Sequence, residues 1–371
     1  MNKFKYISLF ILLAVILFPI INKISDASNK IKYTDKCVFK EEYTNTSEPA
    51  KTLNKQTMGN YYLVDDNWIL GKFSKLIPKN EIKKCSKAIN ELSEISENLG
   101  KDTYFVSMAH KTNMLRHLYP KFVDNKDNID INKNALKTNL NSNNISFIDL
   151  DEYFLNNFTN KDLESFFFKT DHHWNGLGAY EGFKFMVKDL DLDLSDKEIN
   201  KYFSKYKTVI SDKKDFIGSY NSKLGYPIKY KDLTSYVYLE DAKYKYFISD
   251  TKKDNKVKEE KIIASFRNKD RWDYGGAYMR GTNCNILKIK NNKSLTDKKA
   301  IVFRDSYQAP MTWLLADLFS QVEIVDPRYI ENLDMTYEDI IKSSDSDIVL
   351  FMYNSFGFEG MIKEMIDKGI K

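Results

Sequence analysis

Short apolar runs alternate along this chain with longer stretches in which apolar residues recur every three or four positions. The short runs are rich in Val, Ile and Phe, and their length suits strands that are buried in a sheet. They lie at 103–110, 144–154, 298–306, 321–326 and 347–354. The longer stretches have helical spacing and lie at 79–100, 176–190 and 307–319. This order predicts an α/β fold with a mostly parallel sheet and helices on both faces.

Other stretches are less regular. Residues 58–73, MGNYYLVDDNWILGKF, have the alternation of a hairpin with Asp-Asn at its turn. Residues 200–297 mix Tyr-rich, strand-like pieces with a charged loop at 251–262, and we expect them to form an irregular insertion. Residues 23–57 are polar and are typical of a spacer. The pattern therefore predicts one folded domain at 58–371, preceded by a spacer.

The first 22 residues form a separate, apolar segment. Lys3 and Lys5 precede an almost wholly apolar run from Ile7 to Ile21. As a helix this run rises roughly 22 Å, which is short of a ~30 Å hydrocarbon core. No clear cleavage site follows, which favours an uncleaved signal anchor over a signal peptide. Because basic residues tend to stay inside, we expect the domain outside the cytoplasm, held at the cell membrane or, if the segment is cleaved, secreted.

Composition narrows the partners only slightly. The 371 residues carry a formal net charge of +5, with lysines mixed among acidic residues nearly everywhere. A nucleic-acid binder usually gathers basic residues on one face, so we expect no nucleic-acid partner. Aromatic residues make up 14% of the chain, which suits carbohydrate contacts and cores alike. The spacing of Cys37, Cys85 and Cys284 is not that of metal ligands, so no metal is expected. We expect at most one disulfide and leave its pairing open.

The first candidate for chemistry is Ser306. It follows the apolar run 300–303 and begins the helical stretch after it, in the sequence Arg304-Asp305-Ser306. In an open α/β sheet, ligands bind beyond the carboxyl ends of the strands, and helix N–H groups there can stabilise an oxyanion. A simpler role for Ser306 is that of an N-cap, with Asp305 assisting. The segment alone leaves both roles open.

The second candidate is the segment KTDHHWNGLGAY at 169–180. A serine needs a base, His is suited to that task near neutral pH, and a carboxylate can fix the tautomer of the His. In an extended segment Asp171 and His173 lie on the same side and His172 points away. We therefore predict Asp171 and His173 as orienter and base, and a structural role for His172. A D-x-H sequence on a surface loop without function is the alternative.

Together these segments resemble the DHHW-motif proteins, relatives of the AlgX and AlgJ polysaccharide O-acetylation proteins within the SGNH-hydrolase-like superfamily. TDHHWNGLGA followed much later by RDSY carries the resemblance, and four further segments support it in order. These are VDDNWILGKF, YFVSMAHKTNMLRHLYP, VEIVDPRYI and DIVLFMYN. The resemblance covers roughly residues 58–360. It implies an SGNH-hydrolase-like three-layer α/β/α sandwich with permuted motif order, to which the N-terminal membrane helix is added.

The resemblance also implies residue roles. It makes Ser306 the nucleophile, His173 the base and Asp171 the orienter. We expect oxyanion or substrate contacts from a further set: Tyr307, Asn354, Asn283, Lys111, Arg304 and Trp174. The chain departs from the family at 109–111, where Ala-His-Lys replaces a Pro start, at Arg304, and at 352–354, where Met-Tyr-Asn replaces a Glu-Arg pair. These departures concern the pocket and the oxyanion donors more than the triad.

The sequence therefore predicts an acyl transferase or esterase, most simply for acetyl groups, that acts on an envelope or exported polysaccharide through an acyl-serine. No cofactor is expected. A single span cannot carry an activated acyl group across a bilayer, so a multi-span membrane acyltransferase is the expected donor. An esterase for lipid or peptidoglycan shares the triad. The alternative from another class is a non-catalytic polysaccharide-binding or assembly factor on a hydrolase-like fold.

Overall fold

The computed structural model describes residues 56–212, 214–224, 228–249, 253–262, 286–328 and 335–368. Within them, the centre of the molecule is an eight-stranded sheet. Its strands lie in the spatial order β5 (Ser146–Asp149), β4 (Asp102–Met108), β13 (Ile348–Asn354), β11 (Thr296–Arg304), β12 (Phe319–Val325), β10 (Ile286–Lys290), β8 (Lys245–Ser249) and β9 (Asp254–Val257). The first five strands are parallel, and β10, β8 and β9 extend the sheet in antiparallel fashion.

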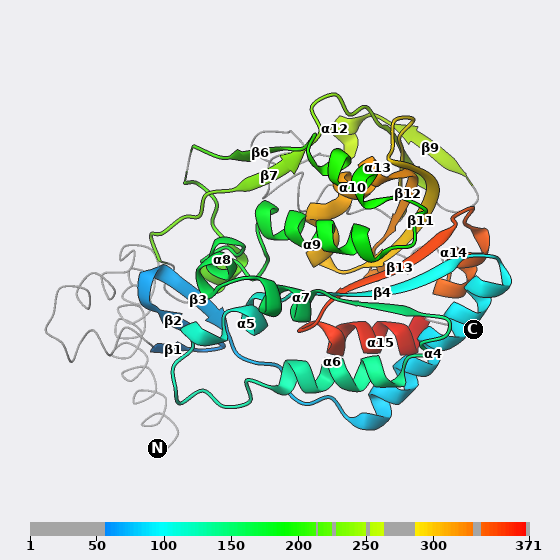
Figure 1. Ribbon diagram of the computed structural model, residues 1–371. Helices are drawn as coiled ribbons and strands as arrows, with labels where there is room; N and C mark the ends of the chain where they lie inside the picture. Colours follow the sequence, from blue (N-terminus) through cyan, green and yellow to red (C-terminus); the bar gives the residue numbers. More distant parts are fainter. Residues whose placement is uncertain are drawn as a thin grey trace, which may run out of the picture.

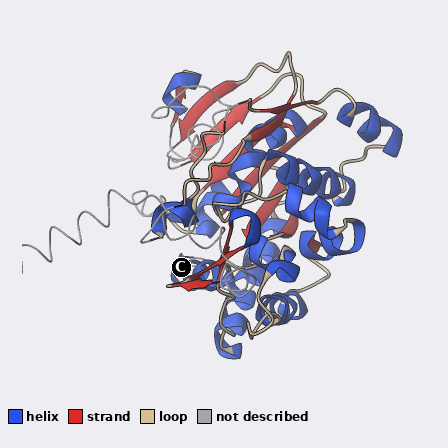
Figure 2. Cartoon of the chain, turned by 90° about the vertical axis from the view of Figure 1, so that its left-hand side faces the viewer, coloured by secondary structure: helices blue, strands red, loops and turns tan. Residues whose placement is uncertain are grey.

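Two layers of helices cover this sheet, as Figures 1 and 2 show from two sides. The side chains of β11 show why, because successive residues point to opposite faces of a strand. Ile301 and Phe303 pack in one cluster of buried side chains, and Ala300 and Val302 in the other. The first cluster is closed by α4 (Lys79–Asn98), α6 (Asn128–Asn139), α14 (Tyr337–Ser343) and α15 (Phe358–Lys368). The second is closed by α7 (Leu150–Asn157), α9 (Gly176–Asp189), α10 (Asp196–Phe203) and α13 (Thr312–Leu318). The predicted mostly parallel α/β sandwich is confirmed.

Smaller elements surround one end of the sheet. The predicted hairpin is confirmed as β2 (Tyr61–Val64) and β3 (Trp68–Gly71), joined by a 3-10 turn at Asp65–Asn67, and β1 (Gln56–Met58) adds a third strand. A second small sheet pairs β6 (Lys207–Ile210) with β7 (Ser235–Tyr238). The short helices are α5 (Lys111–Met114), α8 (Asn160–Ser165), α11 (Ser219–Lys223) and α12 (Glu259–Ile262). The predicted helix at 79–100 ends as expected, with Gly100 at φ +72°, a backbone conformation that glycine adopts readily.

Three predicted elements differ from the structure. The run 144–154 is a strand only as far as Asp149, because the Asp149 carboxylate accepts the N–H of Glu152 and starts α7. The charged stretch expected as a loop contributes β9, an edge strand, where charged side chains are well tolerated. The helix after Ser306 begins as a 3-10 helix, Ser306–Met311, and becomes α-helical only after Pro310, which lacks an N–H group.

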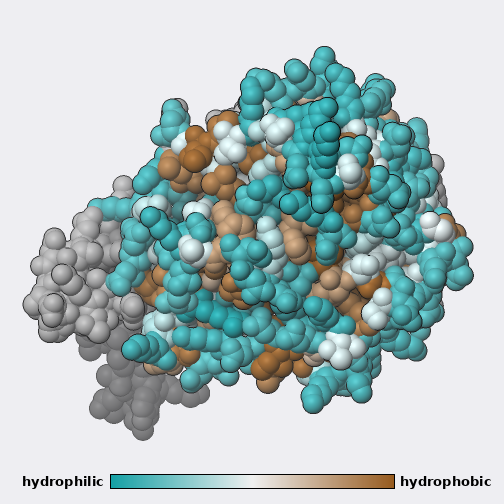
Figure 3. All heavy atoms as spheres, in the orientation of Figure 1, coloured by the Kyte–Doolittle hydropathy of each residue, from teal (hydrophilic) through white to brown (hydrophobic). Residues whose placement is uncertain are grey.

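Predictions about the membrane segment, the cysteines and the surface can be compared with the structure only in part. Within the described residues, no helix combines the length and apolar character that a membrane crossing requires. The predicted membrane segment at 1–22 lies outside the described residues, as do Cys37 and Cys284. Cys85 is a buried free thiol on α4, and burial raises its pKa to about 12. Polar and charged side chains cover most of the face shown in Figure 3, as the mixed charge pattern predicts.

Candidate active site

The parallel strands bring several polar residues to one edge of the sheet, because their carboxyl ends all point the same way. β11 ends just before Asp305 and Ser306, and β13 ends at Asn354. Asp305 accepts the backbone N–H of Tyr307 at 2.8 Å and so caps the 3-10 helix. The capping role that the sequence left open for Ser306 therefore belongs to Asp305, and the half-buried Ser306 hydroxyl remains available for another partner.

That partner is His173. The distance from His173 Nε2 to Ser306 Oγ is 2.9 Å, although 133 positions separate the two residues in the chain. On the far side of the ring, His173 Nδ1 lies 2.6 Å from Asp171 Oδ1. A carboxylate accepts a proton-bearing nitrogen, so we assign the hydrogen to Nδ1 and the lone pair to Nε2, which faces the hydroxyl. The structure thus brings the three predicted residues into one hydrogen-bonded series.

The Asp171 carboxylate is held in place by several donors. Its Oδ1 also accepts the backbone N–H of His173 at 2.9 Å, and its Oδ2 accepts the backbone N–H of Ser219 at 2.6 Å. Burial alone would raise the pKa of this carboxyl group, but the neighbouring imidazoles of His172 and His173 and these hydrogen bonds outweigh it. The pKa of Asp171 consequently lies well below its ordinary value, and the group is an anion at neutral pH.

Two buried aromatic residues join the Asp171–His173 segment to the turn that carries Ser306. The indole Nε1 of Trp174 donates to the carbonyl oxygen of Tyr307 at 2.9 Å, and the Tyr307 hydroxyl donates to the carbonyl oxygen of His172. Both side chains are fully buried. Trp174 is therefore placed as a support and not as a substrate contact. The backbone N–H of Tyr307 is bound to Asp305, so the predicted oxyanion role for this group is not supported.

Lys111 also lies below the surface. Its ammonium group donates to three backbone carbonyl oxygens, those of Ile69 at 2.8 Å, Lys169 at 3.0 Å and Asp171 at 2.8 Å. The side chain is completely buried, and burial lowers its pKa to about 7. The predicted contact with substrate is thus corrected: Lys111 binds the backbone of the loop that carries Asp171.

The remaining predicted contacts have other partners. Arg304 is buried, and its guanidinium Nη2 lies 3.3 Å from Asp326 Oδ2. Asn354 donates both its backbone N–H, at 2.8 Å, and its side-chain amide, at 2.5 Å, to Asp305 Oδ2. Arg304 Nη1 also donates to the carbonyl oxygen of Asp305 at 3.3 Å, so both residues bind the turn that precedes Ser306. Asn283 lies outside the described residues.

Several residues at this site were missed from the sequence, and they come from the stretch expected as an irregular insertion. Asp232 accepts the backbone N–H groups of Lys169 and Thr170, both at 2.9 Å. Gly218 lies so close to the same loop that a Cβ there would come within 2.3 Å of the Thr170 carbonyl. The only signal in the sequence is a Gly-Ser pair before a short helix, which is common in loops and therefore not specific.

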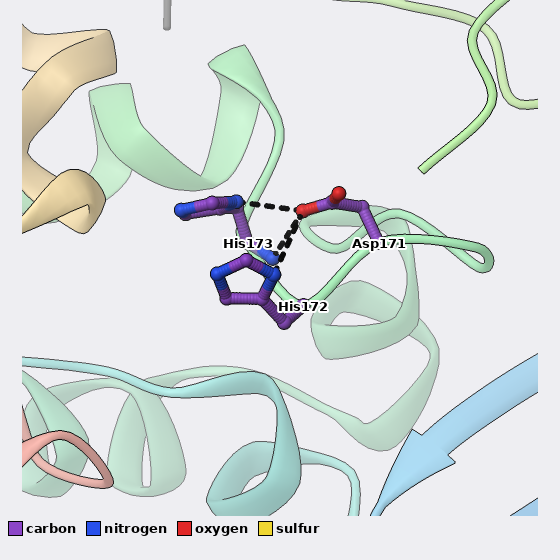
Figure 4. A group of neighbouring side chains, drawn as sticks. All are labelled: Asp171, His172 and His173. Carbon is purple, nitrogen blue, oxygen red and sulfur yellow. Dashed lines mark hydrogen bonds and ion pairs between the residues drawn. The ribbon is translucent and has the colours of Figure 1, made fainter. Parts of the chain in front are cut away.

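His172 does not point away, contrary to the prediction. Residues 169–173 form bends and not an extended strand, so the rings of His172 and His173 lie side by side with centroids 3.7 Å apart (Figure 4). Asp171, His172 and His173 each offer one atom that could bind a metal ion, and these atoms lie within 4.8 Å of one another. The distance of 2.6 Å between Asp171 Oδ1 and His173 Nδ1 is that of a hydrogen bond, so the geometry fits a hydrogen-bonded triad better than a metal site.

Comparison with known proteins places this geometry on a known fold. No protein-family model matches the chain, and no curated protein matches it by sequence. Among solved structures, PatB1 of Bacillus cereus is 23% identical, with a TM-score of 0.65 over 80% of this chain and 96% of that one. PatB1 with a sulfonyl adduct gives 23% identity and a TM-score of 0.66 over 81% and 97%. A DHHW family protein from Eubacterium siraeum is 19% identical, with a TM-score of 0.62 over 84% and 96%.

The chain has the DHHW-protein fold. The predicted resemblance to DHHW-motif proteins is therefore confirmed at the level of the fold. At this degree of sequence identity the likeness covers architecture and not activity, because one fold hosts many chemistries. What the DHHW site of this chain can do has to be argued from its own residues.

Proposed function

We propose that this protein is an extracytoplasmic acyltransferase or esterase in which Ser306 is the nucleophile, His173 the general base and Asp171 the residue that orients the base. The observation that carries the proposal is the distance of 2.9 Å between His173 Nε2 and Ser306 Oγ, with Asp171 at 2.6 Å on the other ring nitrogen. A base within hydrogen-bonding reach of a hydroxyl, and itself oriented by a third group, is the arrangement that activates a serine.

The proposed reaction has two halves. His173 Nε2 takes the proton of Ser306, and Oγ attacks the carbonyl carbon of an acyl donor. The bond to the leaving group breaks, and the leaving oxygen receives the proton from His173, so that an acyl-Ser306 remains. In the second half, an acceptor hydroxyl loses its proton to His173 and attacks the acyl carbon. Ser306 Oγ departs and recovers that proton, which gives a new ester with an alcohol acceptor or a free acid with water.

The developing oxyanion needs hydrogen-bond donors that are not already engaged by other groups. Within the described residues, no hydrogen bond engages the backbone N–H of Ser306, whereas those of Tyr307 and Asn354 are bound to Asp305. We therefore assign the first oxyanion contact to the N–H of Ser306. Loss of one such contact typically reduces turnover about 10²- to 10³-fold, so this assignment matters for the rate.

The substrate class is proposed from the motif resemblance. The DHHW and AlgX-type resemblance suggests an acetyl group and a cell-envelope or exported polysaccharide. The apolar N-terminal segment, which lies outside the described residues, would anchor the chain on the outer side of the membrane, next to a multi-span acyl donor. The alternative, a non-catalytic binding protein, would be favoured by a hydroxyl far from any base, and the 2.9 Å contact argues against it.

Turnover of p-nitrophenyl acetate by the purified full-length protein tests the proposal. We expect release of nitrophenol that falls at least about 10³-fold in Ser306→Ala and in His173→Ala. Ser204→Ala and His117→Ala are matched controls, because both side chains lie on other elements: Ser204 donates to the carbonyl oxygen of Lys201, and His117 contacts Glu164. A sulfonyl fluoride should attach to Ser306, with loss of fluoride, as detected by peptide mass spectrometry. Unchanged turnover in both triad variants would end the proposal.

The natural substrate requires a cellular experiment. Mass spectrometry of envelope glycans from cells that lack the gene distinguishes the two reactions. Fewer acetyl esters would indicate a transferase, and more would indicate an esterase. An unchanged glycan profile would contradict the proposed polysaccharide substrate while leaving the serine chemistry in place.

A further inference from the structure

His172 is the more exposed member of the histidine pair, with 28% of its side chain accessible against 9% for His173. Figure 4 shows that the two rings are side by side and that the Nε2 atoms of both face away from Asp171, on the same side. Because His173 Nε2 meets Ser306 on that side, Nε2 of His172 faces the same region of the site. This placement makes His172 a neighbour of whatever approaches the serine.

The other ring nitrogen of His172 is already engaged. Its Nδ1 lies 2.6 Å from Ser219 Oγ and 3.4 Å from Asp171 Oδ1. Burial, followed by the neighbouring His173, lowers the pKa of His172 to about 3, so the ring is neutral at physiological pH. The anionic Asp171 favours the hydrogen on Nδ1, which leaves a lone pair on Nε2. No hydrogen bond joins that Nε2 to any residue in the described part of the chain.

We propose that Nε2 of His172 accepts a hydrogen bond from a second hydroxyl of the acyl acceptor, next to the hydroxyl that reacts. This inference rests on the proposed function and extends it by naming the acceptor class as a polyol with adjacent hydroxyls. The reacting hydroxyl gives its proton to His173 and forms the new ester bond, and Ser306 takes that proton back. The second hydroxyl keeps its proton throughout, so His172 undergoes no net change.

The energy of one neutral hydrogen bond sets the expected size of the effect. Such a bond corresponds to a preference of about two- to tenfold between acceptors that do and do not make it. The effect should appear in the partition of the acyl-enzyme between alcohol and water. The rate of acylation by the donor need not change, because the acceptor enters only after the acyl-serine has formed.

The experiment uses the purified full-length protein acylated by p-nitrophenyl acetate in the presence of either ethylene glycol or 2-methoxyethanol. These acceptors have the same reacting hydroxyl, but the second oxygen of 2-methoxyethanol cannot donate. The ratio of ester to acetate in the products is measured for each acceptor. Because only active molecules form either product, this ratio does not depend on the fraction of the protein that is active. Because ethylene glycol has two equivalent hydroxyls, the preference is calculated per hydroxyl by dividing its ratio by two. We expect the wild-type protein to prefer ethylene glycol by about two- to tenfold on this scale.

Two variants of His172 make the test specific. His172→Asn keeps a polar group opposite Ser219 but has no atom at the Nε2 position, so the preference should fall to about one. His172→Gln places an amide oxygen near that position and should restore part of the preference. His117→Asn, a histidine that contacts Glu164 instead, should leave the preference unchanged.

The possible failures are distinct. A wild-type protein that shows no Ser306-dependent release of nitrophenol refutes the proposed function itself. Normal release without a preference for ethylene glycol overturns only the inference about His172. A preference that persists in His172→Asn overturns it as well, because another group must then recognise the second hydroxyl.

Discussion

Two aspartates, Asp171 and Asp151, lie buried at the same edge of the sheet, and their surroundings differ in kind. Asp171 contacts an imidazole whose far nitrogen meets a half-buried hydroxyl. Asp151 lies at the start of α7 and accepts the amide of Asn113 at 2.7 Å and the hydroxyl of Ser355 at 3.0 Å. Ser107 also donates to Asp151, at 3.4 Å, so this carboxylate has two serine partners. Both serines are buried, and no imidazole of the described residues lies between them and the carboxylate.

The electrostatic consequences are opposite. At Asp151 burial dominates, although Lys133 lies 4.0 Å away, and the pKa of the carboxyl group is raised to about 6. At Asp171 the partners outweigh burial, and the pKa is lowered. A buried carboxylate with a serine beside it, as at Asp151, lacks the base that activates a serine. What distinguishes the Asp171 site is a titratable ring between the carboxylate and an accessible hydroxyl.

The largest expected effect is on the Asp171 side of the comparison. Asp171→Asn keeps the shape of the side chain but offers an amide to His173 Nδ1, which favours the wrong tautomer. We expect turnover of p-nitrophenyl acetate to fall about 10³- to 10⁴-fold while the protein stays folded, as judged by circular dichroism. Asp124→Asn, on an exposed loop, is the control. A loss of less than tenfold would mean that Asp171 does not govern the base.

Lys133 tests the Asp151 side. This lysine is buried and lies 2.8 Å from Asp149 and 4.0 Å from Asp151. Lys133→Met removes the buried cation that lies beside both carboxylates, so we expect the free energy of unfolding in urea to fall by about 3–5 kcal/mol. Lys137→Met, one turn away with a half-exposed side chain, should cost less than about 1 kcal/mol. Equal losses in the two variants would show that Lys133 is not the ion that balances this cluster.

The smallest expected effect is a dependence of stability on pH. The pKa of Asp151 is 3.8 in the unfolded chain and about 6 in the folded protein, so the folded state binds more protons between these values. Its contribution to the free energy of unfolding should therefore decrease by about 2–3 kcal/mol as the pH rises from about 4 to about 6. For Asp171, whose folded pKa is lowered, stability is lost only as the pH falls below about 4.

Urea titrations of the wild-type protein and Asp151→Asn at several pH values from 4 to 7 measure this contribution. The unfolding free energy of the wild-type protein minus that of Asp151→Asn should decrease as the pH rises in that window. Turnover of p-nitrophenyl acetate at any one pH should not differ between the two proteins. A difference that is constant with pH would mean that Asp151 does not titrate in the folded protein.

Much of the architecture follows from patterns within short segments. The apolar runs that become β4, β11, β12 and β13 predict a sheet, and the Asp171–His173 spacing with Ser306 predicts a triad. Both signals depend on side-chain type at nearby positions, which a sequence displays directly. The fold then supplies only the contact between His173 and Ser306.

The missed features depend instead on backbone groups of distant segments. Ser219 contributes its N–H group to Asp171, and Thr170 contributes its N–H group to Asp232, across gaps of 48 and 62 residues. Every residue except proline has such a group, so no residue type marks these positions. Lys111 was assigned to substrate for a similar reason, because its three acceptors are carbonyl oxygens that any residue could provide.

Asp305 caps the helix, so Ser306 does not have to combine helix capping with its proposed role as nucleophile. Since Asp305 accepts the N–H group of Tyr307 at the start of the helix, the hydroxyl of Ser306 is not needed for the integrity of the turn. An alanine at 306 should consequently yield an inert but intact copy of the molecule. Such a copy could hold an unreacted glycan long enough for crystallography, and the intact polymer could then be seen lying across the site.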